Sequence, residues 1–410
     1  TSIGMLGIDS TSLKNSGTID QSATTAIKSV GMYGTITGNT ETTSTNINNT
    51  GKIYTGTSTQ SNRSIGIFSD VNSVNIINNG IIAGDSNLTG GDFSYGISGH
   101  NITLQNNSDI TVGNDGLGVY ASILPDLFNA GKSTTSTVNI GGKITVGDSK
   151  NDYAIGVLAN NNSVSKFGSS YKQTVNDSNA NFKIGKDGFG YVLLGDGEIS
   201  FSNSSGGTVL LDKDSVYLYS TNSNSNTLIT NNHNFSATGI SNDGINVIYA
   251  AGKVVNNGTV DLSNGIGNVG ITSVNSGTAT NNAKITVGPS NITVTPALYG
   301  IGMVGNQGNV INTSTIEAGS DNSLGMYAEG TAATAGSALN SGTITLKNTG
   351  KNMTGMYAAN YGTASNKGTI EVASNITKVA SGNQEYNAAI RAGGTNSAAI
   401  NGYIDSKTGA

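Results

Sequence analysis

The sequence predicts an all-β protein, a right-handed parallel β-helix (β-solenoid) of about 12 to 13 irregular coils. Three observations lead to this prediction. Two short motifs recur along the chain, both alternate apolar and polar residues with the period of two that is typical of strands, and the copies of each motif are spaced like the coils of a solenoid. Right-handedness is expected because parallel crossover connections almost always take that hand.

The first motif reads apolar-x-Asn-x-Gly-x-Ile. Clear copies end at Ile19, Ile53, Ile82, Val260, Ile344 and Ile370, and degenerate copies end at Ile110, Ile144, Ile184, Ile285, Ile316 and Ile404. Apart from the long gap between Ile184 and Val260, consecutive ends lie from 25 residues apart (Val260 to Ile285) to 40 residues apart (Ile144 to Ile184). Solenoid coils keep such a spacing and absorb the variation in loops.

The Asn of this motif predicts an internal column of amides. Stacking the coils in register places each Asn on the next one, where the side chains can hydrogen-bond along the axis and so tolerate burial. The predicted column comprises Asn15, Asn49, Asn78, Asn106, Asn256, Asn281, Asn312, Asn340 and Asn366.

The second motif lies between copies of the first and reads apolar-Gly-apolar-aromatic-small. Copies begin at Val30, Ile65, Leu117, Leu324 and Thr354. Strand alternation predicts that the residues on either side of the Gly point inward, whereas the Gly and the aromatic residue point outward.

We expect residues 1–410 to form a single β-helix fragment. Residues 185–243 lack the regular spacing, which indicates irregular coils or a small inserted subdomain, and loop insertions are expected at about 121–136 and 160–179. The sequence begins within a repeat, so we expect it to be a piece of a longer chain.

Composition argues against several classes of function. Charged residues make up 11% of the chain, the net charge is −5, there is no Cys, and no apolar run approaches the length of about 20 residues that a membrane helix needs. Nothing resembles a basic footprint for nucleic acid. His100 and His233 are isolated in sequence and are expected to be solvated, and the 25 acidic residues are scattered. We therefore predict no catalytic residues, no metal site, no cofactor and no enzyme activity.

Two features are candidates for partner binding. Tyr33, Phe68 and Tyr120 share the outward aromatic position with Tyr249, Tyr327 and Tyr357, and exposed tyrosines can stack on sugar rings or anchor an interface. Alternatively, these aromatics only stack across strands. The second candidate is the insertion that carries Leu124, Leu127 and Phe128, which either binds a partner or folds back over a coil edge.

The alternation of NSGTI-like and GMYA-like elements resembles the passenger domains of large bacterial type V autotransporter adhesins, most of all those of fusobacterial type. The resemblance implies display on the outer surface of a bacterial cell and attachment to a host-cell or bacterial glycan or protein. It also implies anchoring through a C-terminal β-barrel that is not part of this sequence, and we expect a monomer. Two rival classes are a β-helical polysaccharide lyase or hydrolase and a trimeric tailspike-like phage protein, because the fold alone does not decide function.

Overall fold

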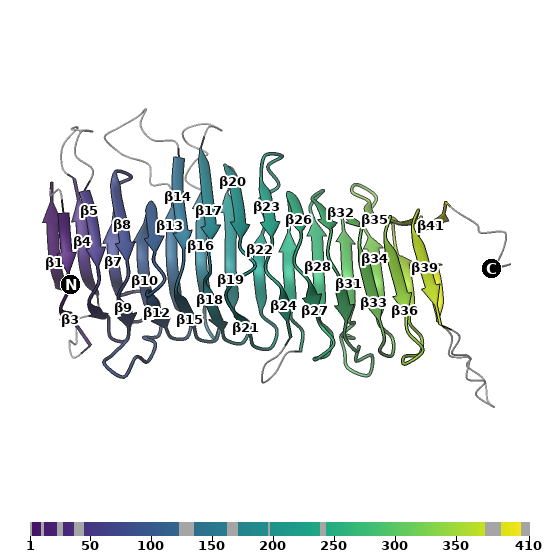
Figure 1. Cartoon of the computed structure of the whole chain (residues 1–410), viewed down its shortest axis with the longest axis horizontal. Helices are drawn as coiled ribbons and strands as arrows, with labels where there is room; N and C mark the ends of the chain where they lie inside the picture. Colours follow the sequence, from purple (N-terminus) through teal and green to yellow (C-terminus); the bar gives the residue numbers. More distant parts are fainter. Residues whose placement is uncertain are drawn as a thin grey trace. The chain divides into compact units, whose positions relative to one another are not determined.

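The structure is a computed structural model that describes residues 2–9, 12–22, 28–36, 45–122, 135–161, 171–195, 197–237, 243–373 and 387–402. All regular elements within these ranges are β-strands, and the strands recur in the same order, coil after coil (Figure 1). The chain divides into two compact units. Unit 1 comprises Thr1–Leu211 and Ser215–Thr227, and unit 2 comprises Asp212–Asp214 and Leu228–Ala410.

Unit 1 contains three sheets, and each coil contributes in turn to sheets A, B and C. Sheet A contains β1 (Ser2–Ile8), β4 (Ser29–Thr35), β7 (Ile65–Ser69), β10 (Tyr95–Gly99), β13 (Leu117–Ser122), β16 (Ile155–Asn161), β19 (Phe189–Gly195) and β22 (Val216–Ser220). Sheet B contains β2 (Ser12–Asn15), β5 (Thr45–Asn49), β8 (Val74–Asn78), β11 (Asn101–Leu104), β14 (Thr135–Ile140), β17 (Lys172–Asp177) and β20 (Glu198–Asn203). Sheet C contains β3 (Thr18–Asp20), β6 (Lys52–Tyr54), β9 (Ile81–Ala83), β12 (Asp109–Val112), β15 (Lys143–Val146), β18 (Asn181–Ile184) and β21 (Val209–Leu211).

Unit 2 repeats this arrangement. Its sheet A contains β25 (Asn246–Ala250), β28 (Val269–Val274), β31 (Ile301–Asn306), β34 (Leu324–Glu329), β37 (Thr354–Ala358) and β40 (Ala388–Ala392). Sheet B contains β23 (Leu228–Asn231), β26 (Lys253–Asn256), β29 (Thr278–Asn281), β32 (Asn309–Asn312), β35 (Gly336–Asn340), β38 (Gly362–Asn366) and β41 (Ala398–Asn401). Sheet C contains β24 (Phe235–Ser236), β27 (Val260–Asp261), β30 (Ile285–Val287), β33 (Thr315–Ala318), β36 (Thr343–Leu346) and β39 (Thr369–Val372).

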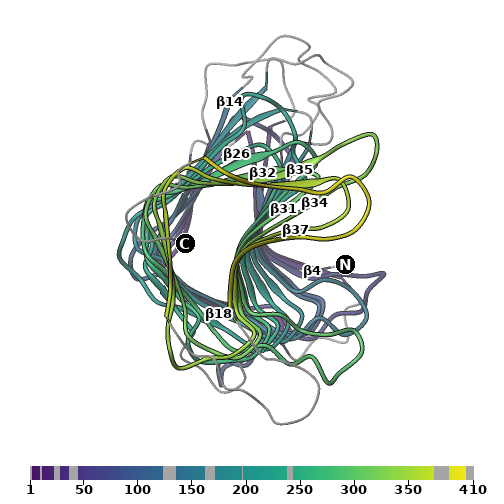
Figure 2. The same ribbon diagram turned by 90° about the vertical axis from the view of Figure 1, so that its right-hand side faces the viewer.

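The predicted right-handed parallel β-helix is confirmed. Within each unit, every described pairing joins a strand to its counterpart one coil away, and the pairs are parallel, as in β4 with β7 and β34 with β37. In unit 2, the strands β31, β34 and β37 overlie one another along one wall of the coil (Figure 2). Among the described residues, sheet A has eight strands in unit 1 and six in unit 2. Residues 185–243, which lack the regular motif, therefore also form coils. In these coils β21, with Leu211, and β24, with Phe235, are the strands of sheet C.

The predicted amide column exists in both units. In unit 2 it runs without interruption, because each side-chain amide donates to the side-chain oxygen of the next Asn at 2.7–3.1 Å, through Asn231, Asn256, Asn281, Asn312, Asn340, Asn366 and Asn401. In unit 1, Asn15 donates to Asn49 at 2.8 Å and Asn49 to Asn78 at 2.7 Å. Apolar columns of the same kind, such as Ile285, Ile316 and Ile344, are fully buried.

The prediction for Asn106 was wrong. The register pairs Asn78 with Leu104, and the Asn78 amide donates instead to the Ser108 hydroxyl at 2.6 Å. Asn106 lies in an exposed turn. This turn contains two more residues than the regular corner, so counting back four residues from Ile110 reached the turn rather than the strand.

The predicted orientation of the second motif was wrong for the Gly and for the residue before it. It was right for the two residues that follow, since Met32 lies inside and Tyr33 outside. A Cβ on Gly31 would lie 2.5 Å from the core side chain of Ile53 and 2.5 Å from the Gly66 carbonyl oxygen, so the Gly faces inward. Met32 is fully buried, whereas Val30 is only partly buried and stands on the other face of the sheet. The strand bends at the Gly, so two consecutive residues face the interior and the apolar residue before the Gly joins the aromatic residue outside.

No helix long and apolar enough to cross a membrane occurs in the part of the chain that the structure describes. Of the predicted insertions, β13 ends at Ser122 and β14 begins at Thr135, while β16 ends at Asn161 and β17 begins at Lys172. Residues 123–134 and 162–170 lie outside the described residues.

Candidate functional site

The outer face of sheet A carries two rows of side chains, one from each side of the strand bend. The first row comes from the residue before the motif Gly, and the second row comes from the aromatic position. In unit 1 the first row is Ile3, Val30, Ile65, Tyr95, Leu117, Ile155, Phe189 and Val216, and the second row is Leu6, Tyr33, Phe68, Ser98, Tyr120, Leu158, Val192 and Tyr219. In unit 2 the first row is Asn246, Val269, Ile301, Leu324, Thr354 and Ala388, and the second row is Tyr249, Thr272, Val304, Tyr327, Tyr357 and Arg391.

The register confirms that the predicted aromatic residues occupy one position of the coil. Tyr33, Phe68 and Tyr120 all stand in the second row of unit 1. Tyr33 and Phe68 stack with ring centroids 5.2 Å apart, and the Tyr33 hydroxyl donates to the Asp70 carboxylate at 2.6 Å. Partial burial, aided by that carboxylate, raises the pKa of Tyr33. The binding role of these residues stays a prediction.

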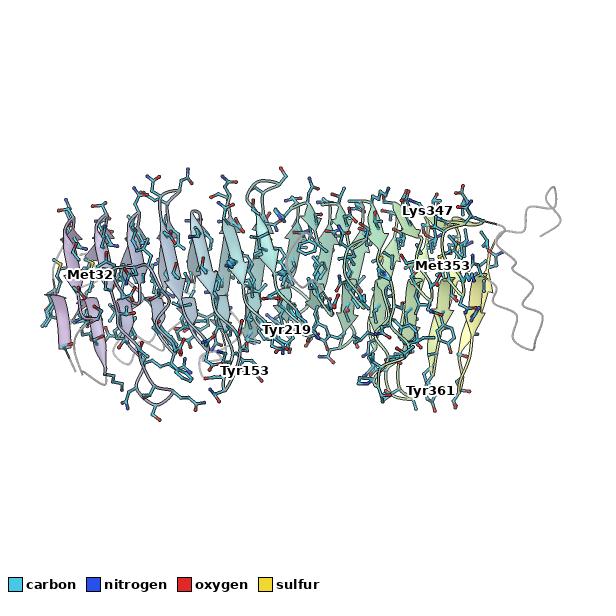
Figure 3. All side chains as sticks on the ribbon, turned by 90° about the horizontal axis from the view of Figure 1, so that it is seen from below. Met32, Tyr153, Tyr219, Lys347, Met353 and Tyr361 are labelled. Carbon is cyan, nitrogen blue, oxygen red and sulfur yellow. The ribbon has the colours of Figure 1, made fainter. Side chains whose placement is uncertain are left out.

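A larger aromatic cluster, the unit 1 patch, covers this face from β10 to β22. It comprises Tyr95, Leu117, Tyr120, Tyr153, Ile155, Leu158, Phe189, Val192, Leu194 and Tyr219. Phe189 meets Tyr153 and Tyr219 edge-on, with centroids 5.9 Å and 5.4 Å apart. Tyr153 is 66% exposed, and it lies on the same edge of the ribbon as Tyr219 (Figure 3). The row residues of this cluster lie on the outer face of sheet A and not in the interior of the β-helix.

Arg63 packs against the unit 1 patch at Tyr95. Its guanidinium lies over the rings of Phe93 and Tyr95, 5.6 Å and 5.2 Å from their centroids, and donates to the Asp115 carbonyl oxygen at 3.0 Å. It also forms an ion pair with Asp152. Arg63 therefore links side chains from successive coils, and its contacts make it a structural residue.

Unit 2 has a groove of about 840 Å³ on the corresponding face. Its floor consists of first-row and second-row side chains of β31, β34, β37 and β40, and its wall consists of a loop before β31. The described residues that line it are Ile292, Tyr299, Ile301, Asn322, Leu324, Tyr327, Asn352, Thr354, Tyr357, Arg391 and Ala392. The rings of Tyr327 and Tyr357 lie 5.7 Å apart, and the Tyr327 hydroxyl donates to Glu329 at 2.6 Å.

The wall of this groove is a hairpin loop between β30 and β31. Asn291 and Leu298 exchange backbone hydrogen bonds of 2.7 Å and 2.8 Å, which close the loop. The Ser290 hydroxyl donates to the Asn322 carbonyl oxygen at 2.9 Å and thereby ties the loop to the next coil. The loop presents Ile292 and Tyr299 to solvent at 49% and 43% exposure. The apolar wall is thus held in place by hydrogen bonds.

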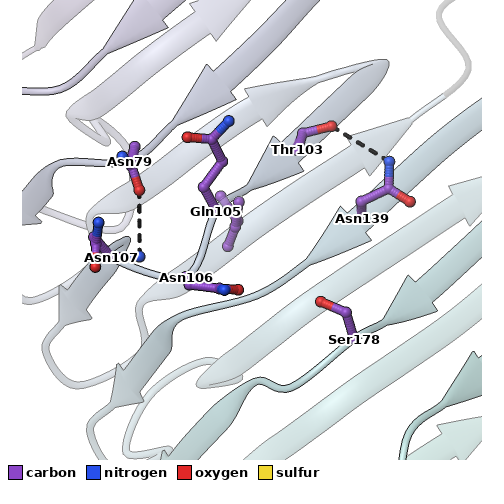
Figure 4. Close-up of a pocket in the computed structure, with 8 residues that line it drawn as sticks. Asn79, Thr103, Gln105, Asn106, Asn107, Asn139 and Ser178 are labelled. Carbon is purple, nitrogen blue, oxygen red and sulfur yellow. Dashed lines mark hydrogen bonds between the residues drawn. The ribbon is translucent and has the colours of Figure 1, made fainter.

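A second hollow, of about 470 Å³, lies over the outer side of sheet B in unit 1 (Figure 4). It is lined by Asn79, Thr103, Leu104, Gln105, Asn106, Asn107, Asn139 and Ser178. Most of these side chains are neutral hydrogen-bonding groups, and some already bond to each other: Asn139 donates to Thr103 at 3.3 Å, and the Asn107 backbone donates to Asn79 at 3.2 Å. Without an aromatic ring or a charged group, this hollow offers less binding chemistry than the unit 2 groove.

Asp177 is a carboxylate buried in the interior of unit 1. Asp177 occupies the coil position that Asn203 occupies one coil later, and it accepts hydrogen bonds from the Tyr191 hydroxyl at 2.8 Å and the Ala180 amide at 2.7 Å. Burial raises the pKa of Asp177 to about 6, although these hydrogen bonds act in the opposite direction. Burial also raises the pKa of Tyr191. Asp177 is only 6% exposed, so it does not form part of an open site.

The expectation that both histidines are solvated was wrong. His100 is fully buried between the carbonyl oxygens of Ser122 and Thr135, 3.3 Å and 3.0 Å from its ring nitrogens, and burial lowers its pKa. His233 is 5% exposed. In the described residues, no group of three or more His, Cys, Asp or Glu side chains is arranged to hold a metal ion.

The other predicted binding residues, Leu124, Leu127 and Phe128, lie outside the described residues. Sequence analysis missed Tyr153, the hairpin at residues 290–299 and Arg391. One signal was present, because two of the three Pro residues, Pro289 and Pro296, fall in or beside this hairpin and mark a break in the repeat.

With this geometry established, comparison with known proteins indicates a family. The family model described as the BigA third pectate lyase-like domain matches residues 134–402. The chain belongs to this family. The BigA-type pectate lyase-like domain is a domain of a bacterial surface protein, and the match covers the described part of unit 2 together with the last coils of unit 1. Neither the curated proteins nor the solved structures include a match to this chain.

Proposed function

We propose that this chain is the ligand-binding part of a bacterial surface adhesin of the passenger type. The observation that carries the proposal is the pair of aromatic and apolar rows on the outer face of sheet A. Exposed aromatic side chains are the residues that most often anchor interfaces, because they bury a large area and lose little rotamer entropy. The chain is otherwise rich in Asn, Ser and Thr, whose small polar side chains offer little binding energy.

Membership of the BigA-type pectate lyase-like family supports a location on the bacterial surface or outside the cell. The composition agrees with export, since a chain with no Cys cannot form premature disulfides. The resemblance of the repeats to autotransporter passengers leads to the same proposal, with a host-cell or bacterial-surface glycan or protein as the partner.

Binding without catalysis is the simplest use of this face. Sugar-cleaving enzymes commonly need two carboxyl groups placed on either side of the bond that breaks. The described residues that line the unit 2 groove include no Asp or Glu, and Asp177, the carboxylate with the raised pKa, is enclosed in the interior of unit 1.

The experiment is a cell-attachment assay with the purified, fluorescently labelled chain on epithelial cells and on bacteria. We expect saturable attachment that a combined Tyr33→Ser, Phe68→Ser and Tyr327→Ser variant reduces, while deletion of Pro125–Ser133 tests the candidate loop separately. A matched control is Asn257→Ser, which removes an exposed amide from the outer side of sheet B. Failure of the folded wild-type chain to attach to any cell type would refute the proposed function.

The second candidate function is polysaccharide cleavage, which the description of the family favours. The same protein incubated with acidic and neutral polysaccharides gives the test. Release of new reducing ends or unsaturated products would establish an enzyme, whereas retention of the polysaccharide on the protein without cleavage would support a binding domain.

A further inference from the structure

We propose that the unit 2 groove binds an oligosaccharide that carries an anionic group, a carboxylate or a sulfate. In this arrangement Arg391 pairs with the anion, and Tyr327 and Tyr357 stack against the sugar rings. The proposal rests on the proposed function, because it names the ligand class for the same face of sheet A.

The tyrosines provide a stacking surface that follows the coil repeat. Tyr327 and Tyr357 stand at the same register position on β34 and β37, with ring centroids 5.7 Å apart, and Tyr299 faces them from the hairpin wall. Coils succeed each other at about 4.8 Å. That distance is similar to the length of one sugar unit in a linear oligosaccharide, so neighbouring rings can meet neighbouring sugars.

Arg391 adds a positive charge at one end of this surface. It is the second-row neighbour of Tyr357 on β40, and it is one of only two Arg residues in a chain whose net charge is −5. A guanidinium matches a carboxylate or sulfate with two parallel hydrogen bonds. Glu329, two residues beyond Tyr327 on β34, accepts a hydrogen bond from the Tyr327 hydroxyl.

The remaining lining suits hydroxyl groups better than a peptide. Asn322 and Asn352 are neutral, partly exposed side chains that can donate to or accept from sugar hydroxyls. The backbones of β31, β34 and β37 are paired with strands on both sides, so a peptide could not add itself as another strand at this place. Recognition in the groove therefore depends on side chains alone, which favours a sugar.

The other arginine provides an internal comparison. Arg63 stands beside the aromatic residues of unit 1, but its guanidinium is held by Asp152, the Asp115 carbonyl and two rings. The unit 1 patch is thus stabilised by its arginine. Arg391 lines the unit 2 groove and also has an interaction within the chain.

The test uses the whole chain and four sets of oligosaccharides of equal length: sialylated, uronate-containing, sulfated and neutral. Calorimetry or a glycan array measures the affinities. We expect at least one anionic set to bind at least about tenfold more tightly than its neutral counterpart, and this difference to shrink with salt. Which anionic set binds distinguishes the source of the charge.

Variants separate the roles of the residues. Arg391→Gln should remove the preference for the anionic ligand, Arg391→Lys should restore part of it, and Tyr327→Ser with Tyr357→Ser should weaken all ligands. Lys347→Gln is the matched control, because Lys347 pairs with Glu317 on sheet C, and its affinity should equal that of the wild type. Melting temperatures confirm that each variant is folded.

Three results would overturn the proposal: equal affinity for neutral and anionic sugars, unchanged affinity in folded Arg391→Gln, or displacement of the sugar by an acidic peptide at equal concentration. These outcomes differ from failure of the adhesin function. If wild type and Arg391→Gln attach equally well to cells, the groove assignment fails and the adhesin proposal stands, whereas a wild-type chain that attaches to no cell refutes the adhesin function itself.

Discussion

The side-chain amide of Asn312 donates a hydrogen bond to the side-chain oxygen of Asn340 in the following coil at 2.9 Å. Both side chains are fully buried. Each also donates to a backbone carbonyl two residues further along its own chain, Asn312 to Ser314 at 2.8 Å and Asn340 to Gly342 at 3.2 Å. One Asn therefore holds the corner of its own coil and joins two coils together.

Replacing Asn340 by Leu should lower the free energy of unfolding by about 1–3 kcal/mol, because Asn312 and Asn366 lose a partner in a buried site. Thermal unfolding followed by circular dichroism measures the effect. Asn282→Leu is the control, because Asn282 bonds to Asn257 on the exposed side of the same sheet and its loss should be small. If both variants melt at the wild-type temperature, the internal column does not stabilise the fold.

Asp177→Asn should stabilise the protein at pH 7–8. The folded pKa of about 6 lies above the ordinary value of 3.8, so the folded state holds this proton more tightly than the unfolded state. The free energy of unfolding contributed by Asp177 therefore falls as pH rises from about 4 to about 6 and stays low above that. A shift of this size corresponds to roughly 2–3 kcal/mol.

The measurement is the difference in unfolding free energy between wild type and Asp177→Asn as a function of pH, which removes the contributions of the other acids. The difference should be small near pH 4 and should grow up to about pH 6. Asp109→Asn is the control, because Asp109 pairs with Lys143 on the outer side of sheet C. A difference that does not change with pH would show that the Asp177 carboxylate titrates normally.

The fold was predictable because its two main determinants are local and repeated. These determinants are the buried Asn and the terminal apolar residue of the first motif. The spacing of the motif alone predicts the positions of Asn256 and Ile285, and stacking identical corners predicts the parallel register. The error at Asn106 arose where a corner had gained two residues, because spacing measured from Ile110 then shifts by one full alternation. The error at Val30 and Gly31 arose because a bend places two consecutive residues, Gly31 and Met32, inward, which strict alternation does not allow.

The candidate site was predictable only in part. The second-row aromatics, such as Tyr357, carry a sequence signature because they lie within the repeat. The hairpin wall carries no such signature because it is an insertion. Arg391 carries none because it lies in a coil whose other residues depart from the GMYA pattern. The buried state of His100 also had no local signal, because its partners, the carbonyl groups of Ser122 and Thr135, lie in the following coil.

Gly325→Ala tests the inward orientation of the motif Gly. A Cβ at Gly325 would lie 2.5 Å from the Gly355 carbonyl oxygen and 2.9 Å from the Ile344 side chain. Because the nearer contact is backbone, we expect a loss of about 1–3 kcal/mol, which urea unfolding measures. Gly319→Ala is the matched control, since a Cβ there would first meet the side chains of Thr349 and Lys347 at 3.1 Å and 3.4 Å, which can move. Equal stability of the two variants would contradict the inward orientation.

Arg63→Met should destabilise unit 1 and loosen the patch around Tyr95. The substitution keeps an apolar stem over the Phe93 and Tyr95 rings but removes the ion pair with Asp152 and the hydrogen bond to the Asp115 carbonyl. The side chain is only 18% exposed, so the loss of these partly buried contacts should cost about 1–3 kcal/mol. Arg63→Lys retains the charge but lacks the planar guanidinium, so its stability should lie between that of the wild type and that of Arg63→Met. Thermal unfolding measures stability, and near-ultraviolet circular dichroism follows the packing of the tyrosines. A wild-type melting temperature for Arg63→Met with an unchanged tyrosine signal would mean that the aromatic rings hold one another without the guanidinium.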